Sequence, residues 1–333
     1  MDAERAHNFV IQNAHNFPFM GYLFSNQKLD KNFQVDIAGL KWSSPVGLAA
    51  GLDKNAEAIN FFTTLGFGAV EVGTVTPYSQ VGNERPRMFR YIEEESLRNR
   101  MGFNNDGSSE ILENLKNSNS NGKVVGVNLG KNKWTTLKNA HKDYQMLYDK
   151  FSPFADYLVI NVSSPNTPGL RQLQEISFLE DIFDSLFEGR KKVNKPLFLK
   201  ISPDMAIEDI SGVVELCKNK NLAGIIGTNT SVDIQRGPGG MSGKLIFNKS
   251  KSIRELFLKE INGTNLEFIG VGGFSNYEQL VEFWKLGGKA IQIYTSFIFQ
   301  GPSILSSINK SIKEDLVKNN ISDLESLIKE YQR

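Results

Sequence analysis

Residues 267–273 have the sequence Glu-Phe-Ile-Gly-Val-Gly-Gly, and residues 290–296 have the sequence Ala-Ile-Gln-Ile-Tyr-Thr-Ser. Each stretch is a short apolar run that ends in small or hydroxyl residues, as a buried strand does where it enters a turn. Six earlier stretches repeat this pattern. We therefore expect eight strands: Val46–Ala50, Ala69–Gly73, Val124–Asn128, Tyr157–Asn161, Leu197–Ile201, Ala223–Thr228, Glu267–Gly272 and Ala290–Tyr294.

The spacing of these strands predicts the architecture. Their starts lie roughly 35 residues apart on average, close to the length of one strand, one helix and their connections. Eight such units predict an α/β fold of the (β/α)8 type, a TIM barrel. An open, doubly wound sheet is the competing architecture, but the sequence shows no centre at which the strand order would reverse. The long connections after the second and fourth strands are expected on the catalytic face.

The N-terminal segment differs from the repeating units. Residues 2–16 predict a helix that ends before Pro18, with a packing stripe on one face formed by Ala3, Ala6, Val10, Ala14 and Phe17. Residues 17–24, Phe-Pro-Phe-Met-Gly-Tyr-Leu-Phe, are more apolar than simple packing needs. We expect residues 1–30 to form a small helical cap, residues 31–333 to form the barrel, and residues 34–44 to form a short hairpin. Packing across the barrel end is the simpler interpretation of the cap, and an apolar docking surface is the alternative.

Composition excludes several classes of protein. The 38 Lys and Arg residues against 37 Asp and Glu residues leave a formal charge of +1, without the positive field that nucleic-acid binding requires. The single cysteine, Cys217, cannot form an intramolecular disulfide, and we expect it to be buried in a helix. His7, His15 and His141 lack a metal-ligand spacing, so no metal site is expected. No segment carries the ~20 apolar residues of a membrane-spanning helix.

Amides, hydroxyls and lysines, rather than carboxylates, follow the predicted strands. Because the carboxyl ends of parallel barrel strands meet at one rim, we expect these residues to surround one site. Asparagine offers both a donor and an acceptor, which suits a planar ligand with carbonyl and imide edges. The residues are Lys54, Thr74, Asn128, Lys131, Asn161, Ser164, Lys200, Thr228, Asn229, Thr230, Gly272, Gly273, Tyr294, Thr295 and Ser296.

The last two strands indicate a phosphate site. Gly272-Gly273 and Thr295-Ser296 follow the seventh and eighth strands, where barrels of this type commonly bind phosphate. A phosphate beside a planar ring, with neither a metal nor a reactive thiol, indicates flavin mononucleotide (FMN), one per chain and non-covalent. Lys200 closes an apolar run and would stabilise negative charge on the reduced ring.

Four motifs carry a resemblance: residues 47–54 (Gly-Leu-Ala-Ala-Gly-Leu-Asp-Lys), 71–77 (Glu-Val-Gly-Thr-Val-Thr-Pro), 99–105 (Asn-Arg-Met-Gly-Phe-Asn-Asn) and 161–170 (Asn-Val-Ser-Ser-Pro-Asn-Thr-Pro-Gly-Leu). From about residue 2 to residue 302 the chain resembles the dihydroorotate dehydrogenase family, class 2, which is quinone-dependent. The resemblance implies oxidation of (S)-dihydroorotate to orotate in de novo pyrimidine biosynthesis. FMN would be the first electron acceptor, and a membrane quinone, ubiquinone or menaquinone, the final one.

The resemblance also implies a role for each motif position. Ser164 would be the catalytic base, with Thr167 in its proton relay, whereas class 1 relatives use cysteine. FMN would contact Ala50, Gly51, Leu52, Asp53, Lys54, Thr74, Asn128, Asn161, Lys200, Thr228, Gly243, Gly273, Tyr294 and Thr295. The substrate would contact Lys54, Asn99, Arg100, Met101, Gly102, Phe103, Asn161, Asn166, Asn229 and Thr230. His7, Arg90 and Tyr294 would lie near the quinone tunnel.

The cap would place such an enzyme on a membrane surface. We expect a monomer bound peripherally to the cytoplasmic face of a bacterial cell membrane, or to the mitochondrial inner membrane if a leader has been removed. Two alternatives remain open from the sequence. One is a soluble, class 1-like flavin dehydrogenase that uses fumarate or NAD, and the other is a non-redox barrel that binds a phosphate ligand.

Overall fold

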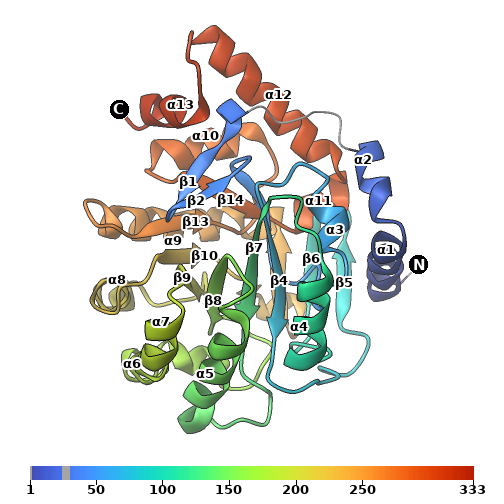
Figure 1. Ribbon diagram of the computed structural model, residues 1–333, viewed down its shortest axis with the longest axis vertical. Coiled ribbons are helices and arrows are strands. Elements are labelled where there is room, and N and C mark those ends of the chain that lie inside the picture. The colour runs from blue at the N-terminus through green and yellow to red at the C-terminus, as the bar shows by residue number, and fades with distance from the viewer. Residues whose placement is uncertain (1, 25–30) are drawn as a thin grey trace.

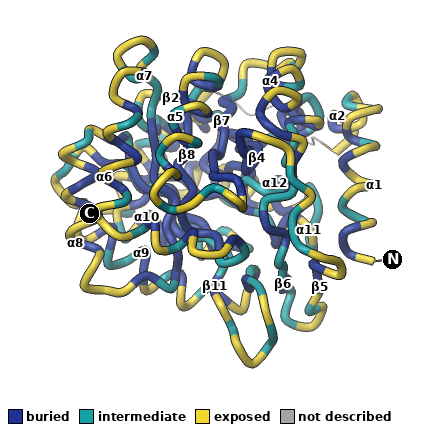
Figure 2. Tube along the Cα trace, turned by 90° about the horizontal axis from the view of Figure 1, so that it is seen from below, coloured by how far each residue is buried: buried dark blue, intermediate teal, exposed yellow. Residues whose placement is uncertain are grey.

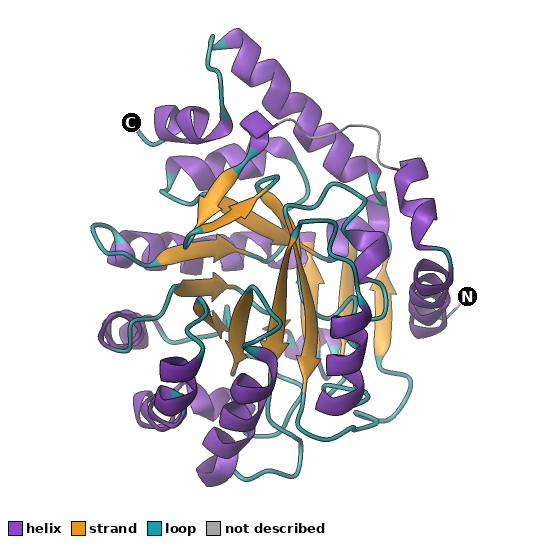
Figure 3. Ribbon diagram, viewed as in Figure 1, coloured by secondary structure: helices purple, strands orange, loops and turns teal. Residues whose placement is uncertain are grey.

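The computed structural model describes residues 2–24 and 31–333, and its centre is a closed barrel of eight parallel strands (Figures 1 and 3). Neighbouring strands follow the order of the chain and close between the last and the first. The strands are β3 (Val46–Leu48), β4 (Ala69–Val75), β7 (Val124–Leu129), β8 (Tyr157–Asn161), β9 (Leu197–Ile201), β10 (Gly224–Gly227), β13 (Glu267–Gly270) and β14 (Ala290–Ile293). The predicted TIM barrel and all eight of its strands are confirmed.

Helices surround the barrel, and their apolar faces cover the strands. Every residue of β4, β7, β8 and β9 is buried, because side chains fill the barrel interior and helices cover its outside (Figure 2). The helices are α3 (Ile59–Phe62), α4 (Ser108–Asn117), α5 (Ala140–Phe151), α6 (Ile176–Ser185), α7 (Phe187–Lys192), α8 (Ile210–Asn219), α9 (Phe247–Ile261), α10 (Tyr277–Lys285), α11 (Thr295–Gln300), α12 (Ser303–Lys318) and α13 (Leu324–Tyr331). Cys217 is fully buried on α8, as expected.

The predicted hairpin is present immediately before the first barrel strand. It consists of β1 (Val35–Ile37) and β2 (Leu40–Trp42), which pair antiparallel. The Trp42 ring is fully buried and stacks on the ring of Tyr157, a residue of β8, with 6.4 Å between ring centres. The hairpin therefore seals the end of the barrel at which the strands begin.

A second, four-stranded antiparallel sheet was not predicted. Its order is β11 (Ser231–Val232), β12 (Gly240–Gly243), β6 (Ser96–Asn99) and β5 (Met88–Tyr91). The long connections after β4 and β10 supply these strands, and Gly240 of β12 lies opposite Asn99 of β6. The pairing of β6 with β12 joins strands far apart in the chain and leaves no local signal, and no strands were predicted in either connection.

The N-terminal helix α1 (Ala3–Asn16) is confirmed, and a short helix α2 (Gly21–Phe24) follows it on the outside of the barrel (Figure 1). The predicted packing stripe was wrong at Val10 and Phe17, which are 50 % and 46 % exposed. Ala3 and Ala14 of the predicted stripe are buried, together with Glu4 and Ile11. Glu4 is turned inward, because its carboxylate pairs with the buried Arg87 in the connection between β4 and β5. Met1 and residues 25–30 of the predicted cap lie outside the described residues.

The described helices are each too short or too polar to cross a bilayer. Asp2 begins α1, since its carboxylate accepts hydrogen bonds from the N–H groups of Glu4 and Arg5, both at 3.0 Å. Pro18 follows the end of the helix, as its missing N–H and fixed φ predict.

Candidate active site

One cavity opens at the carboxyl ends of the barrel strands and encloses about 1210 Å³, including space open to solvent. Strands β6 and β12 of the second sheet contribute Asn99, Ser242 and Gly243 to its wall. Twenty-one of the residues predicted for the rim, the cofactor or the substrate line it: Ala50, Gly51, Lys54, Thr74, Asn99, Met101, Gly102, Phe103, Asn161, Ser164, Asn166, Lys200, Thr228, Asn229, Thr230, Gly243, Gly272, Gly273, Tyr294, Thr295 and Ser296. The long connections thus bring motifs from across the chain to one place.

Five residues predicted for the rim, the cofactor or the substrate do not line the cavity: Leu52, Asp53, Arg100, Asn128 and Lys131. Leu52 packs in the core, and the guanidinium of Arg100 donates to a backbone carbonyl at 2.9 and 3.1 Å. The Lys131 ammonium turns away and donates to a carbonyl of its own loop at 2.8 Å. Burial raises the pKa of Asp53 to about 6, although its carboxylate accepts two backbone N–H bonds of 2.9 Å. These residues support the wall.

The floor of the cavity is organised by Glu71, a fully buried carboxylate in the middle of β4. Its Oε1 accepts from Asn128 Nδ2 at 2.8 Å and pairs with Lys200 Nζ at 3.4 Å. Its Oε2 accepts from Gln292 Nε2 at 2.7 Å and from the Tyr157 hydroxyl at 3.1 Å. A buried charge is stable only when it is paired and hydrogen-bonded, and Glu71 is both.

The sequence analysis missed this cluster of Glu71, Tyr157 and Gln292. A signal was available, because a carboxylate and an amide each stand inside an otherwise apolar strand. Burial, followed by the nearby charge of Glu71, raises the pKa of Tyr157 well above its ordinary value, so the phenol stays protonated and donates. The cluster fixes the position of the Lys200 ammonium in the cavity.

A ladder of hydrogen bonds connects the floor to the wall. The Thr74 hydroxyl donates to Asn128 Oδ1 at 2.6 Å, and Asn161 Nδ2 donates to the same oxygen at 2.9 Å. Asn229 Nδ2 in turn donates to Ser163 Oγ at 2.9 Å. Because each amide is oriented by its neighbour, the asparagines present fixed donors and acceptors to a ligand.

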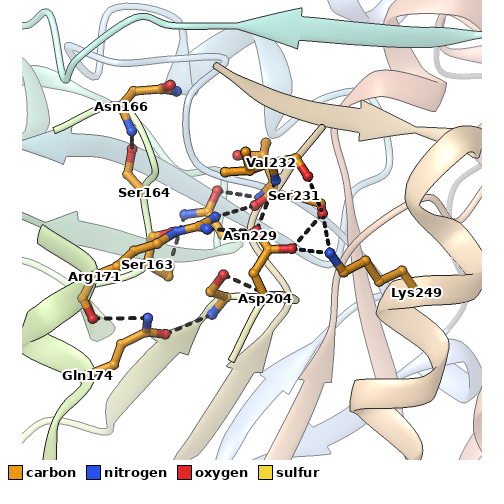
Figure 4. Close-up of polar contacts among 12 residues, drawn as sticks. Ser163, Ser164, Asn166, Arg171, Gln174, Asp204, Asn229, Ser231, Val232 and Lys249 are labelled. Carbon is orange, nitrogen blue, oxygen red and sulfur yellow. Dashed lines mark hydrogen bonds and ion pairs between the residues drawn. The ribbon is translucent and has the colours of Figure 1, made fainter. Parts of the chain in front are cut away.

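Ser164 lies in the loop after β8 and is 7 % exposed. Its Oγ accepts a hydrogen bond from the N–H of Asn166 at 3.2 Å (Figure 4). The Asn166 side chain donates to Asn99 Oδ1 at 3.0 Å, which ties the loop to the second sheet. Thr167, three residues after Ser164, is buried, and its hydroxyl has no hydrogen-bond partner among the described residues.

Arg171 anchors this loop, a role that its sequence position did not suggest (Figure 4). Its Nε donates to the carbonyl of Ser163 at 3.1 Å, and its Nη2 donates to the carbonyl of Thr230 at 2.8 Å. Its Nη1 pairs with Asp204 at 2.6 Å, and Asp204 also pairs with Lys249. One guanidinium therefore fixes the loops after β8, β9 and β10 relative to each other.

The N-terminal helix reaches the cavity through His7. The Lys54 ammonium, which lines the cavity, lies 3.0 Å from His7 Nε2. Burial, together with the charge of Lys54, lowers the pKa of His7 to about 3, so the imidazole is neutral and can accept. Burial also lowers the pKa of Lys54 to about 8. Tyr294 lines the cavity as well, whereas Arg90 lies on β5 in the second sheet.

Several polar atoms of the wall lack a partner within the described part of the chain. They are Asn104 Oδ1, Thr230 Oγ1, Gln292 Oε1 and Ser296 Oγ, all buried and all on residues that line the cavity. Buried polar groups are normally hydrogen-bonded, so this wall fits a polar ligand. At one end, Gly272 and Gly273 adopt positive φ angles of +102° and +86°, which only glycine adopts readily. Their backbone lines the cavity and suits a phosphate.

Fold and cavity together define a (β/α)8-barrel enzyme with its site at the carboxyl ends of the strands. The family model Dihydroorotate dehydrogenase matches residues 32–316. The chain therefore belongs to the dihydroorotate dehydrogenase family.

Relatives with known names support this family assignment. The chain is 42 % identical over 328 residues to "Dihydroorotate dehydrogenase (quinone)" of Vibrio atlanticus (strain LGP32), covering 94 % of this chain and 96 % of that protein. A protein of the same name from a Nitratiruptor species is 40 % identical over 98 % of this chain and 95 % of its own. The crystal structure of Eimeria tenella DHODH in complex with ferulenol aligns with a TM-score of 0.90 and 33 % identity, covering 98 % and 95 % of the two chains. The chain is thus similar to the quinone-dependent class, class 2.

Proposed function

We propose that this chain oxidises (S)-dihydroorotate to orotate, a step of pyrimidine biosynthesis, and passes the electrons to a membrane quinone. The observation that carries the proposal is that Ser164, Lys200 and the amides of Asn99, Asn166 and Asn229 line a single cavity. The base is a serine, and the chain's one thiol is buried on α8 away from this cavity. That combination favours the quinone-dependent reaction over the soluble, class 1-like alternative.

We propose FMN as the cofactor, and the wall fits it. The phosphate would contact Gly243, Gly273 and Thr295, while the ring would lie over the floor, near Lys200 and Asn161. The unpartnered hydroxyl of Ser296, which lines the cavity nearby, could donate to such a phosphate. When bound, FMN would supply the two-electron chemistry that links the substrate to the quinone.

The polar residues of the wall would hold the substrate. Its carboxylate and imide edges match the ammonium of Lys54 and the amides of Asn99, Asn166 and Asn229. Ser164 Oγ would take the proton that leaves one ring carbon as the neighbouring carbon loses a hydride. A serine hydroxyl is a weak base, so its own proton must move on. The buried hydroxyl of Thr167, three residues further along the same loop and without a hydrogen-bond partner among the described residues, would relay that proton toward solvent. Closure of the loop that Arg171 anchors would exclude water.

The cap would deliver the quinone. Ala3 of α1 packs with Met88 and Met101, and both methionines line the cavity. We infer that this apolar contact marks the path from the cavity to the cap, which exposes Phe9, Val10, Phe17, Phe19, Met20, Tyr22, Leu23 and Phe24. We propose that residues 1–30 form a membrane-bound access cap on a monomeric FMN barrel of residues 31–333, at the cytoplasmic face of a bacterial membrane.

An anaerobic titration tests the function. Purified protein should show a stoichiometric flavin spectrum that dihydroorotate bleaches and a short-chain quinone restores. Restoration by fumarate or NAD but not by quinone would favour the soluble alternative. A colourless protein that stays colourless after incubation with excess FMN would refute the proposal.

A further inference from the structure

Arg254 of α9 is a buried cation without a carboxylate partner. It is 2 % exposed, and its guanidinium carbon lies 4.3 Å from the ring centre of Phe274 and 5.3 Å from that of Phe247. Within residues 2–24 and 31–333 it forms no ion pair. Since an uncompensated charge is costly to bury, something near Arg254 must offset that cost.

The nearest carboxylates do not neutralise it. Glu255 and Glu282 act on Arg254 only through their charge, and both pair with Lys251, at 3.7 and 2.5 Å. Burial lowers the pKa of Arg254 to about 9, so the guanidinium remains positive at neutral pH. Besides the two aromatic rings, its contacts are hydrogen bonds to backbone carbonyls.

Those contacts are with the segment after β13. Nη1 of Arg254 donates to the carbonyl of Val271 at 2.8 Å and to the carbonyl of Gly272 at 3.0 Å. Both peptide groups are trans, so the N–H groups of Gly272 and Gly273 point away from the arginine. Both glycines line the cavity, and neither N–H has an acceptor among the described residues.

The glycine pair packs closely against α9, so that neither position has room for a side chain. A Cβ on Gly272 would lie 2.5 Å from Ser250 Oγ, and one on Gly273 would lie 2.8 Å from the Cα of Phe247. Both contacts are with α9, the helix that carries Arg254. The helix and the glycine segment therefore form one tightly packed unit behind this end of the cavity.

We propose that Arg254 is a positioning residue for the phosphate of the ligand. It orients the two free N–H groups of the Gly272-Gly273 segment toward the cavity, and its own charge attracts the phosphate dianion from behind that segment. The inference rests on the FMN site proposed above. In turn, the phosphate supplies the negative charge that the buried guanidinium lacks.

Riboflavin, which is FMN without its phosphate, separates this role from a structural one. The flavin is removed from the purified full-length protein, and the dissociation constants for FMN and riboflavin are measured by flavin fluorescence quenching. Two substitutions separate the contribution of the charge from that of the hydrogen bonds: Arg254→Gln keeps an N–H donor without charge, and Arg254→Lys keeps the charge. Arg190→Gln is the matched control, since Arg190 also donates to two backbone carbonyls, at 2.6 Å, and does not line the cavity.

We expect Arg254→Gln to weaken FMN binding by at least about tenfold and to leave riboflavin binding nearly unchanged. Arg254→Lys should recover most of the FMN preference, and Arg190→Gln should alter neither constant. Equal loss of both flavins in Arg254→Gln and Arg254→Lys, or unchanged FMN binding in Arg254→Gln, would overturn the assignment while leaving the proposed function intact. If the unmodified protein binds neither flavin, both proposals fail.

Discussion

The floor of the barrel and the N-terminal helix bury charged groups in opposite ways. On the floor, Glu71 and Lys200 are part of a closed set of hydrogen bonds in which every neighbour is also buried. On α1, polar contacts with the barrel come from Glu4, His7 and His15, while most large apolar side chains face outward. Many mutual contacts thus hold the floor together, whereas few contacts hold the cap to the barrel. We infer that the barrel contains the chemistry and that the cap can be altered separately.

Deletion of the cap is the strongest test of whether the cap can be altered without affecting the chemistry of the barrel. Deletion of residues 2–24 should abolish reduction of a long-chain quinone, because the apolar path from the membrane to the cavity would be lost. Reduction of the bound flavin by dihydroorotate should persist, since the floor makes no contact with α1 in its hydrogen-bond network. Stopped-flow absorbance measures the first half-reaction, and a quinone assay with vesicles measures the second.

The full-length chain is the control for that deletion. Full-rate quinone reduction by the truncated chain would show that the cap is not the route. Loss of dihydroorotate-driven bleaching would show that cap and barrel are not separable.

A substitution at the proposed base in the barrel should have the opposite effect, since it leaves the cap unchanged. Ser164→Ala should slow flavin reduction by dihydroorotate by about 10²–10⁴-fold, because the proton acceptor is lost while the surrounding amides remain. Flavin content and oxidation of pre-reduced enzyme by quinone should be unchanged. Single-turnover reduction at the unmodified rate would remove Ser164 from its role.

The weak attachment of α1 can be measured through Glu4. Its carboxylate accepts from Arg87 Nη2 at 2.7 Å, with both side chains buried, and from the exposed Arg85 at 3.1 Å. Burial opposes ionisation, but the hydrogen bonds and charges of these two arginines outweigh it and lower the pKa of Glu4. Glu4→Gln should reduce the free energy of opening of α1 by about 3 kcal/mol, because it leaves Arg87 buried without its counter-charge. Amide hydrogen exchange over residues 3–16 reports this opening.

Arg85→Gln is the matched control for Glu4→Gln. Its side chain is 68 % exposed, so its pair with Glu4 should contribute less than about 1 kcal/mol. Comparable protection factors in the two variants would contradict the assignment of the buried pair as the anchor of the cap.

The smallest effect concerns Lys54, which contacts both regions. Its pKa of about 8 keeps the ammonium charged at pH 7, and the charge is lost as the pH rises through that value. If this charge binds the substrate carboxylate, KM for dihydroorotate should be about tenfold higher at pH 9 than at pH 7. Lys54→Arg stays charged over this range, so its KM should remain flat. A parallel rise in both proteins would assign the titration to another group.

Local patterns were enough to predict the barrel and much of its rim. Apolar runs that end in glycine, threonine or asparagine identified all eight strands, because parallel strands buried on both faces need apolar residues at most positions. The same runs placed Asn161, Ser164 and Lys200 at strand ends, and all three line the cavity. Asp53 and Asn128 also lie at strand ends, yet neither lines it. A position at a strand end places a residue at the rim of the barrel, but it does not determine whether the side chain points into the cavity.

The fold class, the N-terminal helix and the residue types available for the site could all be inferred from the amino-acid order, because each depends on neighbours along the chain. Three features became visible only in the folded chain: β6 pairs with β12 over the cavity, Glu71 holds Lys200, and α1 turns Glu4 toward Arg87. Each of these depends on groups brought together from distant segments, where burial and charge select the partner. The role proposed for Arg254 also depends on the folded chain, since the sequence of its helix gives no sign of the glycine backbone that it orients.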